Sequence, residues 1–104
     1  MFHKATKVTV IAERLIQNKL TAILDDAGAR GYTLVESGGK GEHFTRSRDR
    51  ASVVGAFAII RIEVILADDQ QARDIATEIE AKLFSKHSGV VYLSPVEIMR
   101  PERF

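Results

Sequence analysis

The sequence predicts an α+β domain with the ferredoxin-like order β-α-β-β-α-β, that is, a four-stranded antiparallel sheet with two helices on one face. Three observations predict this class. Four segments alternate apolar and polar residues with the two-residue period of a strand, two segments repeat apolar residues with the period of a helix, and the two kinds follow one another in the split βαβ order. We expect a single domain over residues 1–104.

The first half of the chain supplies a strand, a helix and a second strand. The segment KVTVIAE, residues 7–13, is rich in β-branched residues and alternates as a buried strand does. A helix begins near Arg14, and Gly28 or Gly31 ends it. Its apolar stripe consists of Ile16, Leu20, Ile23, Leu24 and Ala27. Residues 31–36, GYTLVE, return to the strand period.

The second half repeats the pattern after a long loop. Residues 56–67 give the longest strand signal, with Arg61 and Glu63 interrupting one face, where we expect them to form an ion pair. Asp68 and Asp69 are suited to the N-cap and first turn of the second helix. Its buried stripe consists of Ala72, Ile75, Ala76, Ile79 and Leu83. Residues 90–99 form the last strand, and Pro95 restricts it to an edge of the sheet or a strand end.

Both faces of this sheet carry aliphatic side chains, although two helices can cover only one. Val8, Val10 and Ile60 belong to one face, whereas Ile11, Ile59 and Ile65 belong to the other. A second subunit is therefore expected to cover the face without helices.

Composition limits the function classes. The chain has no cysteine, which excludes disulfides, thiolate catalysis and cysteine-ligated metal sites. No segment reads as a signal peptide or approaches the roughly 20 apolar residues of a membrane span, so we expect a cytoplasmic protein without membrane insertion. A net charge of +1 gives no overall field that favours nucleic acid.

The loop between the second and third strands is the most unusual segment. It holds Gly38, Gly39 and Gly41 around Lys40, followed by several arginines. Glycine amides and a mobile cation suit a phosphate cradle, but the same composition also suits a solvated hairpin connection, and the loop lacks the Walker A pattern. A connection of about 20 residues is uncommon in a compact domain unless it has a function.

Three segments together resemble the PII-type signal transduction proteins, and most closely their PII-like branch, the SbtB and carboxysome-associated group. They are AGARGYTLVESGGKG (27–41), IRIEVILADDQ (60–70) and GVVYLSPVEIMR (89–100). The resemblance implies a homotrimer that binds adenine nucleotides between neighbouring subunits. It identifies the long loop, about residues 37–55, as the T-loop, which closes on the ligand and docks on partner proteins.

The same resemblance implies the binding residues and the ligand. The nucleotide-binding candidates are Gly38, Gly39, Lys40, Gly41, Arg46, Ser88, Gly89, Arg100 and Arg103. The short segment FSKHSG replaces the longer glycine-rich segment with which PII proteins hold ATP, which favours AMP, ADP or cyclic AMP over ATP. Glu42 and His43 stand where the branch usually carries a further arginine, and the loop has no tyrosine for uridylylation.

The resemblance also implies a regulatory, non-catalytic role. The expected partner is a bicarbonate transporter or another component of inorganic carbon uptake or fixation, such as a carboxysome-related protein. Bicarbonate is a further candidate ligand, and no covalently bound cofactor is expected.

Two other functions share features of this sequence. A trimeric, CutA-like metal-binding protein would use His3, His43 and His87, but these residues have no ligand spacing. An RNA-binding module has the same element order, but only Phe57 supplies an aromatic side chain for base stacking on the third strand. The adjacent carboxylate pairs, Asp25 with Asp26 and Asp68 with Asp69, are better explained by helix solvation and capping than by acid and base catalysis.

Overall fold

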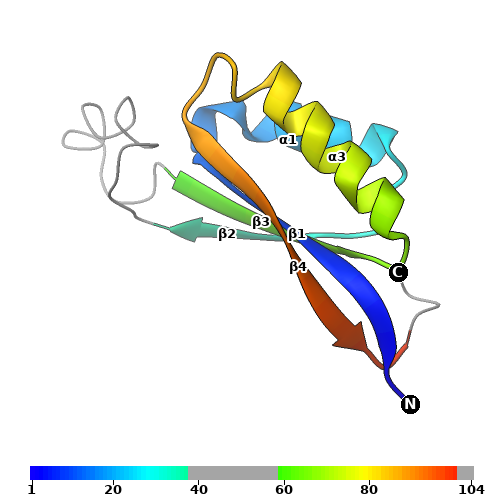
Figure 1. Cartoon of the computed structure of the whole chain (residues 1–104). Helices are drawn as coiled ribbons and strands as arrows, with labels where there is room; N and C mark the ends of the chain where they lie inside the picture. Colours follow the sequence, from blue (N-terminus) through cyan, green and yellow to red (C-terminus); the bar gives the residue numbers. More distant parts are fainter. Residues whose placement is uncertain (38–58, 101–104) are drawn as a thin grey trace.

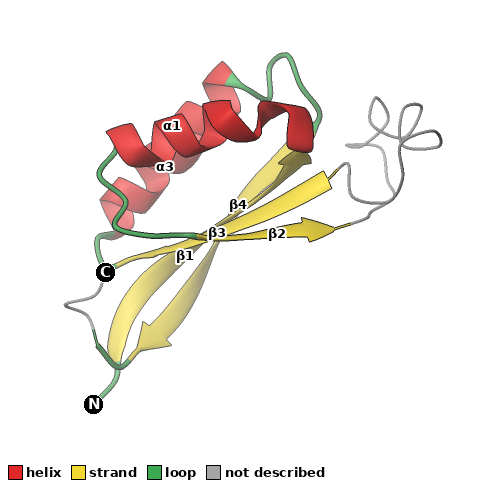
Figure 2. Ribbon diagram, turned by 180° about the vertical axis from the view of Figure 1, so that it is seen from behind, coloured by secondary structure: helices red, strands yellow, loops and turns green. Residues whose placement is uncertain are grey.

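The protein has two layers, a twisted sheet and a pair of helices that cover one of its faces (Figure 1). The computed structural model describes residues 1–37 and 59–100. The elements are β1 (His3–Glu13), a 3-10 turn η1 (Arg14–Ile16), α1 (Gln17–Asp26), β2 (Thr33–Ser37), β3 (Ile59–Leu66), α3 (Asp69–Lys82) and β4 (Gly89–Ile98). The strands are antiparallel neighbours in the order β2-β3-β1-β4. Figure 2 shows from behind that both helices lie on the same side of the sheet. The predicted ferredoxin-like class is confirmed.

The first strand is longer than its alternation predicts, because it begins at His3 rather than Lys7. Its first residues pair only with the end of β4, from His3 opposite Ile98 onward, whereas its pairing with β3 begins at Thr6. The two strands therefore extend together beyond the rest of the sheet (Figure 1). The third strand, predicted over 56–67, spans Ile59–Leu66, and residues 56–58 lie outside the described part.

The core lies between the sheet and the helices. The apolar sides that the sequence predicts for the strands and for both helices face into it. Alternate residues of β1 and β3 meet the apolar stripes of both helices, as the two-residue and 3.6-residue periods require. The fully buried side chains include Val8, Val10, Ile16, Leu20, Leu24, Ile60, Ile62, Val64, Leu66, Ile75 and Ile79.

Local signals in the sequence fix the ends of both helices. Gly28 adopts φ 79°, and the N–H groups of Gly28 and Ala29 donate to the carbonyl groups of Asp25 and Leu24 at 3.1 Å, which is a Schellman motif. Gly28, rather than Gly31, therefore ends the first helix. The Asp68 carboxylate accepts from the N–H of Gln70 at 2.9 Å, which confirms the predicted N-cap of α3.

Asp69 connects the start of α3 to β1. Its carboxylate accepts from Arg73 Nε and from Thr6 Oγ1, each at 2.7 Å. These hydrogen bonds, first from Arg73 and then from Thr6, hold the pKa of the Asp69 carboxyl below its usual value. These hydrogen bonds therefore stabilise the folded protein fully above the pKa of an unfolded aspartate, about 3.9. Their contribution is lost as the pH falls through the lower pKa that Asp69 has in the folded protein.

Asp69→Asn is therefore expected to destabilise the protein more at pH 7 than at acidic pH. Urea unfolding of both proteins at pH 7 and near pH 3 measures the difference. Asp74→Asn on the exposed side of α3 is the matched control, because the hydrogen bond that Asp74 accepts comes from Gln70 within its own helix and does not connect α3 to the sheet. A destabilisation by Asp69→Asn that stays constant across this range would contradict the assigned role.

Candidate nucleotide site at the end of the sheet

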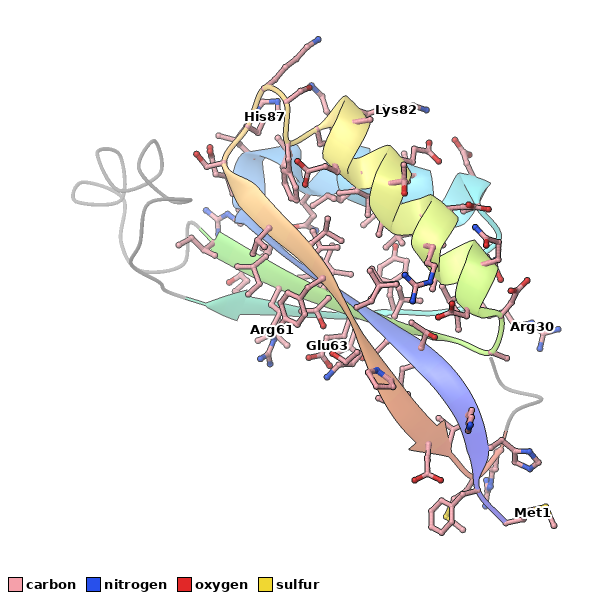
Figure 3. All side chains as sticks on the ribbon, in the orientation of Figure 1. Met1, Arg30, Arg61, Glu63, Lys82 and His87 are labelled. Carbon is pink, nitrogen blue, oxygen red and sulfur yellow. The ribbon has the colours of Figure 1, made fainter. Side chains whose placement is uncertain are left out.

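The sheet face without helices combines apolar side chains with a small charged cluster. Val35 and Tyr92 are 38% and 44% exposed on this face. Arg61 Nε and Lys7 Nζ lie 3.8 and 3.9 Å from Glu63 Oε2, so the predicted ion pair of Arg61 with Glu63 is confirmed and includes a lysine. Arg61 and Glu63 point away from the helices (Figure 3).

Two segments that are far apart in sequence meet at one end of the sheet. Ser37 and Ile59, which flank the long loop, are paired with each other, and Ile59 is also paired with Glu13 at the end of β1. On the other side of β1, Ala12 is paired with Gly89. The structure therefore brings the base of the loop to the same end of the sheet as Ser88 and Gly89.

A contact that the sequence does not reveal holds the turn before β4. The N–H of Ser88 donates to Glu13 Oε1 at 3.2 Å, and Glu13 is only 4% exposed. The turn is also tightly packed at Gly89, where an added Cβ would lie 2.3 Å from Phe84 Cε1 and 2.9 Å from the carbonyl oxygen of Ile11. The amide of Ser88 is thus engaged by a carboxylate, and Gly89 has a packing reason to lack a side chain.

Arg100 lies at the opposite end of the sheet from Ser88 and Gly89. Gly89 is the first residue of β4 and Arg100 follows its last residue, Ile98, so the length of the strand, about 30 Å, lies between them. Within one chain these residues cannot contact the same small ligand. The remaining candidates, Gly38, Gly39, Lys40, Gly41, Arg46 and Arg103, lie outside the described residues.

A cleft of about 640 Å³ lies near the Arg100 end, between the start of α3 and the paired ends of β1 and β4. It is lined by Lys4, Ala5, Thr6, Ala67, Asp69, Pro95, Val96 and Glu97. Of the predicted nucleotide-binding residues that the structure describes, Ser88, Gly89 and Arg100, none lines this cleft.

No three histidine or carboxylate side chains of residues 1–37 and 59–100 gather where they could hold a metal ion. His3 is on β1, His87 is in the turn after α3, and His43 lies outside the described residues. No helix in the described part of the chain has the length and apolar character needed to cross a membrane.

These features define a ferredoxin-like domain with a long insertion between β2 and β3 and a candidate site divided between the two ends of its sheet. The sequence profile of the family described as nitrogen regulatory protein P-II matches residues 5–103. The chain belongs to this family, whose members are signalling regulators.

Solved structures that resemble the protein include PII-like proteins with bound ligands. CPII from Thiomonas intermedia K12 bound to ADP and bicarbonate is 26% identical, with a TM-score of 0.80 and coverage of 100% of this chain and 97% of that chain. CPII bound to ADP, AMP and bicarbonate is 28% identical, with a TM-score of 0.76 and coverage of 97% and 99%. A PII-like signalling protein from Thermus thermophilus is 24% identical, with a TM-score of 0.78 and coverage of 98% and 96%, and it supports the fold.

Proposed function

We propose that the protein is a homotrimeric, non-catalytic PII-like sensor that binds an adenine nucleotide between neighbouring subunits. AMP, ADP or cyclic AMP is the ligand rather than ATP, and bicarbonate is a second ligand. The nucleotide is held by Gly38, Gly39, Lys40, Gly41, Arg46, Ser88 and Gly89 of one subunit and by Arg100 and Arg103 of the next. The ligands of CPII support this choice of nucleotide and anion.

The observation that carries the proposal is the division of the predicted residues between the two ends of the sheet. The loop base, Ser88 and Gly89 share one end, whereas Arg100 follows β4 at the other. Residues that are about 30 Å apart in one chain can form one site only if a second chain supplies some of them.

The face without helices supports the same assembly. Exposed apolar side chains on it, including Tyr92 and Val35, would be removed from water by a neighbouring subunit. Thr9 Oγ1 is buried on this face and has no hydrogen-bond partner among the described residues. Because buried hydroxyl groups are almost always hydrogen-bonded, the neighbouring subunit or a trapped water molecule supplies its partner.

Ligand binding orders the T-loop, about residues 37–55, through charge-assisted contacts from Lys40 and Arg46 to phosphate. The ordered loop presents a different surface to a partner in inorganic carbon uptake or fixation, a bicarbonate transporter or a carboxysome-related protein. The protein thereby reports nucleotide and bicarbonate levels to that partner in the cytoplasm.

Isothermal titration with AMP, ADP, ATP and cyclic AMP, each with and without bicarbonate, tests the proposal. We expect saturable binding near one nucleotide per chain, with affinity shifted by bicarbonate. Arg46→Ala should abolish most of this affinity, because Arg46 is proposed to contact phosphate, whereas Arg48→Ala removes the same charge from the same loop and should have a small effect. Failure of every nucleotide to bind would contradict the proposal and favour direct partner or metal recognition.

A further inference from the structure

A buried carboxylate lies beside the turn that is proposed to contact the nucleotide. Glu13 ends β1 and is 4% exposed, and its Oε1 accepts the N–H of Ser88 at 3.2 Å. A charged acceptor makes this hydrogen bond stronger than one between neutral groups. The turn is therefore already bound to an anionic group of the protein itself.

The position of Glu13 places it within the proposed site rather than beside it. Glu13 is paired with Ile59, the first described residue after the long loop, and its neighbour Ala12 is paired with Gly89. A phosphate group that reaches both the loop base and the turn at Ser88 and Gly89 must approach this carboxylate.

The turn is closely packed against Phe84 and β1 at Gly89. The ring of Phe84 and the carbonyl oxygen of Ile11 leave no space for a side chain at Gly89, where an added Cβ would lie 2.3 and 2.9 Å from them. The turn that carries Ser88 therefore packs directly against the strand that ends in Glu13.

The cation next to Glu13 in the sequence is paired with another carboxylate. Arg14, the next residue in the chain, directs Nη1 to Glu36 Oε1 on β2 at 3.4 Å. The amide of Ser88, which a phosphate oxygen would use, already donates to Glu13. An approaching phosphate thus meets an occupied donor and a negative charge of the same sign as its own.

We propose that Glu13 is a specificity-determining residue that penalises each additional phosphate of the bound nucleotide. The inference rests on the proposed nucleotide-sensing function and supplies a physical basis for selection against ATP. The penalty is smallest for AMP, larger for ADP and largest for ATP, because repulsion grows with the charge of the phosphate chain. Glu13 acts on the ligand through its negative charge and through the hydrogen bond that it accepts from the Ser88 N–H.

Glu13→Gln tests this inference, because glutamine has nearly the same shape, can still accept from Ser88 N–H and lacks the charge. Affinities for AMP, ADP and ATP are measured by isothermal titration at one ionic strength for both proteins. We expect the affinity for ATP to rise about tenfold, the affinity for ADP to rise less, and the affinity for AMP to change least, as expected when one buried like charge is removed. Asp74→Asn on the exposed surface of α3 is the control, since it makes the same change in net charge at a position about two helical turns before the C-terminal end of α3, after which the Ser88 turn follows.

A second variant, Glu13→Met, keeps the inference falsifiable if the glutamine variant does not fold. Methionine is also uncharged, and it releases the Ser88 amide for phosphate, so the gain for ATP should be at least as large. If the folded, uncharged variants bind ATP, ADP and AMP with the same ratios of affinity as the wild type, the inference is overturned and the proposed function is left intact. Absence of binding of every nucleotide to the wild-type protein would overturn both.

Discussion

Ile11→Lys is expected to convert the trimer to monomers. Ile11 is half-buried on the sheet face without helices, directly opposite Arg61 of β3 and Val90 of β4. In a monomer the new ammonium group would remain in water. In a trimer that covers this face, it would be buried beside a second cation in each subunit, and an unpaired buried charge costs on the order of several kcal/mol. Size-exclusion chromatography with light scattering measures the change in mass.

Thr77→Lys is the matched control for this variant. Thr77 is exposed on α3, in the layer that lies on the opposite side of the sheet from Ile11. Thr77→Lys should leave the mass of the assembly unchanged. The far-UV circular dichroism of both variants should remain that of the wild type. An Ile11→Lys protein that stays trimeric would show that this face is not the subunit interface.

Gly89→Ala is expected to lower the free energy of unfolding by about 1–3 kcal/mol, the usual range for overpacking. Its Cβ would lie 2.3 Å from Phe84 Cε1, 2.5 Å from Phe84 Cζ and 2.9 Å from the carbonyl oxygen of Ile11. The aromatic ring can rotate, but the carbonyl group belongs to the backbone of β1 and cannot move without disturbing its pairing. The same variant should weaken nucleotide binding, because it displaces the turn that carries Ser88.

Gly31→Ala provides the comparison at a second glycine. Nothing lies within 4 Å of a Cβ built at Gly31, and its backbone is outside the left-handed region. Alanine there should be neutral or should stabilise the protein by up to about 1 kcal/mol through the reduced entropy of the unfolded chain. Urea unfolding compares the two variants, and equal stabilities would contradict the packing described at Gly89.

Periodicity was sufficient to predict the fold because each element carries its own local pattern. The alternation in β1 and β3 predicts which side chains meet the helices, and Val8, Val10 and Ile62 are buried as expected. Pro95 lies in β4, which is an edge strand, as the missing N–H of proline predicts. The first three residues of β1 lack a comparable pattern, since their strand conformation depends on pairing with the distant end of β4.

The candidate site was less predictable because it depends on contacts between distant segments. Glu13 and Ser88 are separated by 75 positions, and nothing in either local sequence indicates their hydrogen bond. Gly89 and Arg100 are close in sequence, but the strand between them places them at opposite ends of the sheet. Only the three-dimensional arrangement shows that these two candidates cannot contact the same small ligand within one chain.

Native mass spectrometry of the protein with ADP tests the central claim most directly. We expect an assembly of three 11.5 kDa chains that carries up to three ADP molecules, one at each subunit interface. A monomer that binds ADP, or a trimer that binds none at saturating concentration, would contradict it.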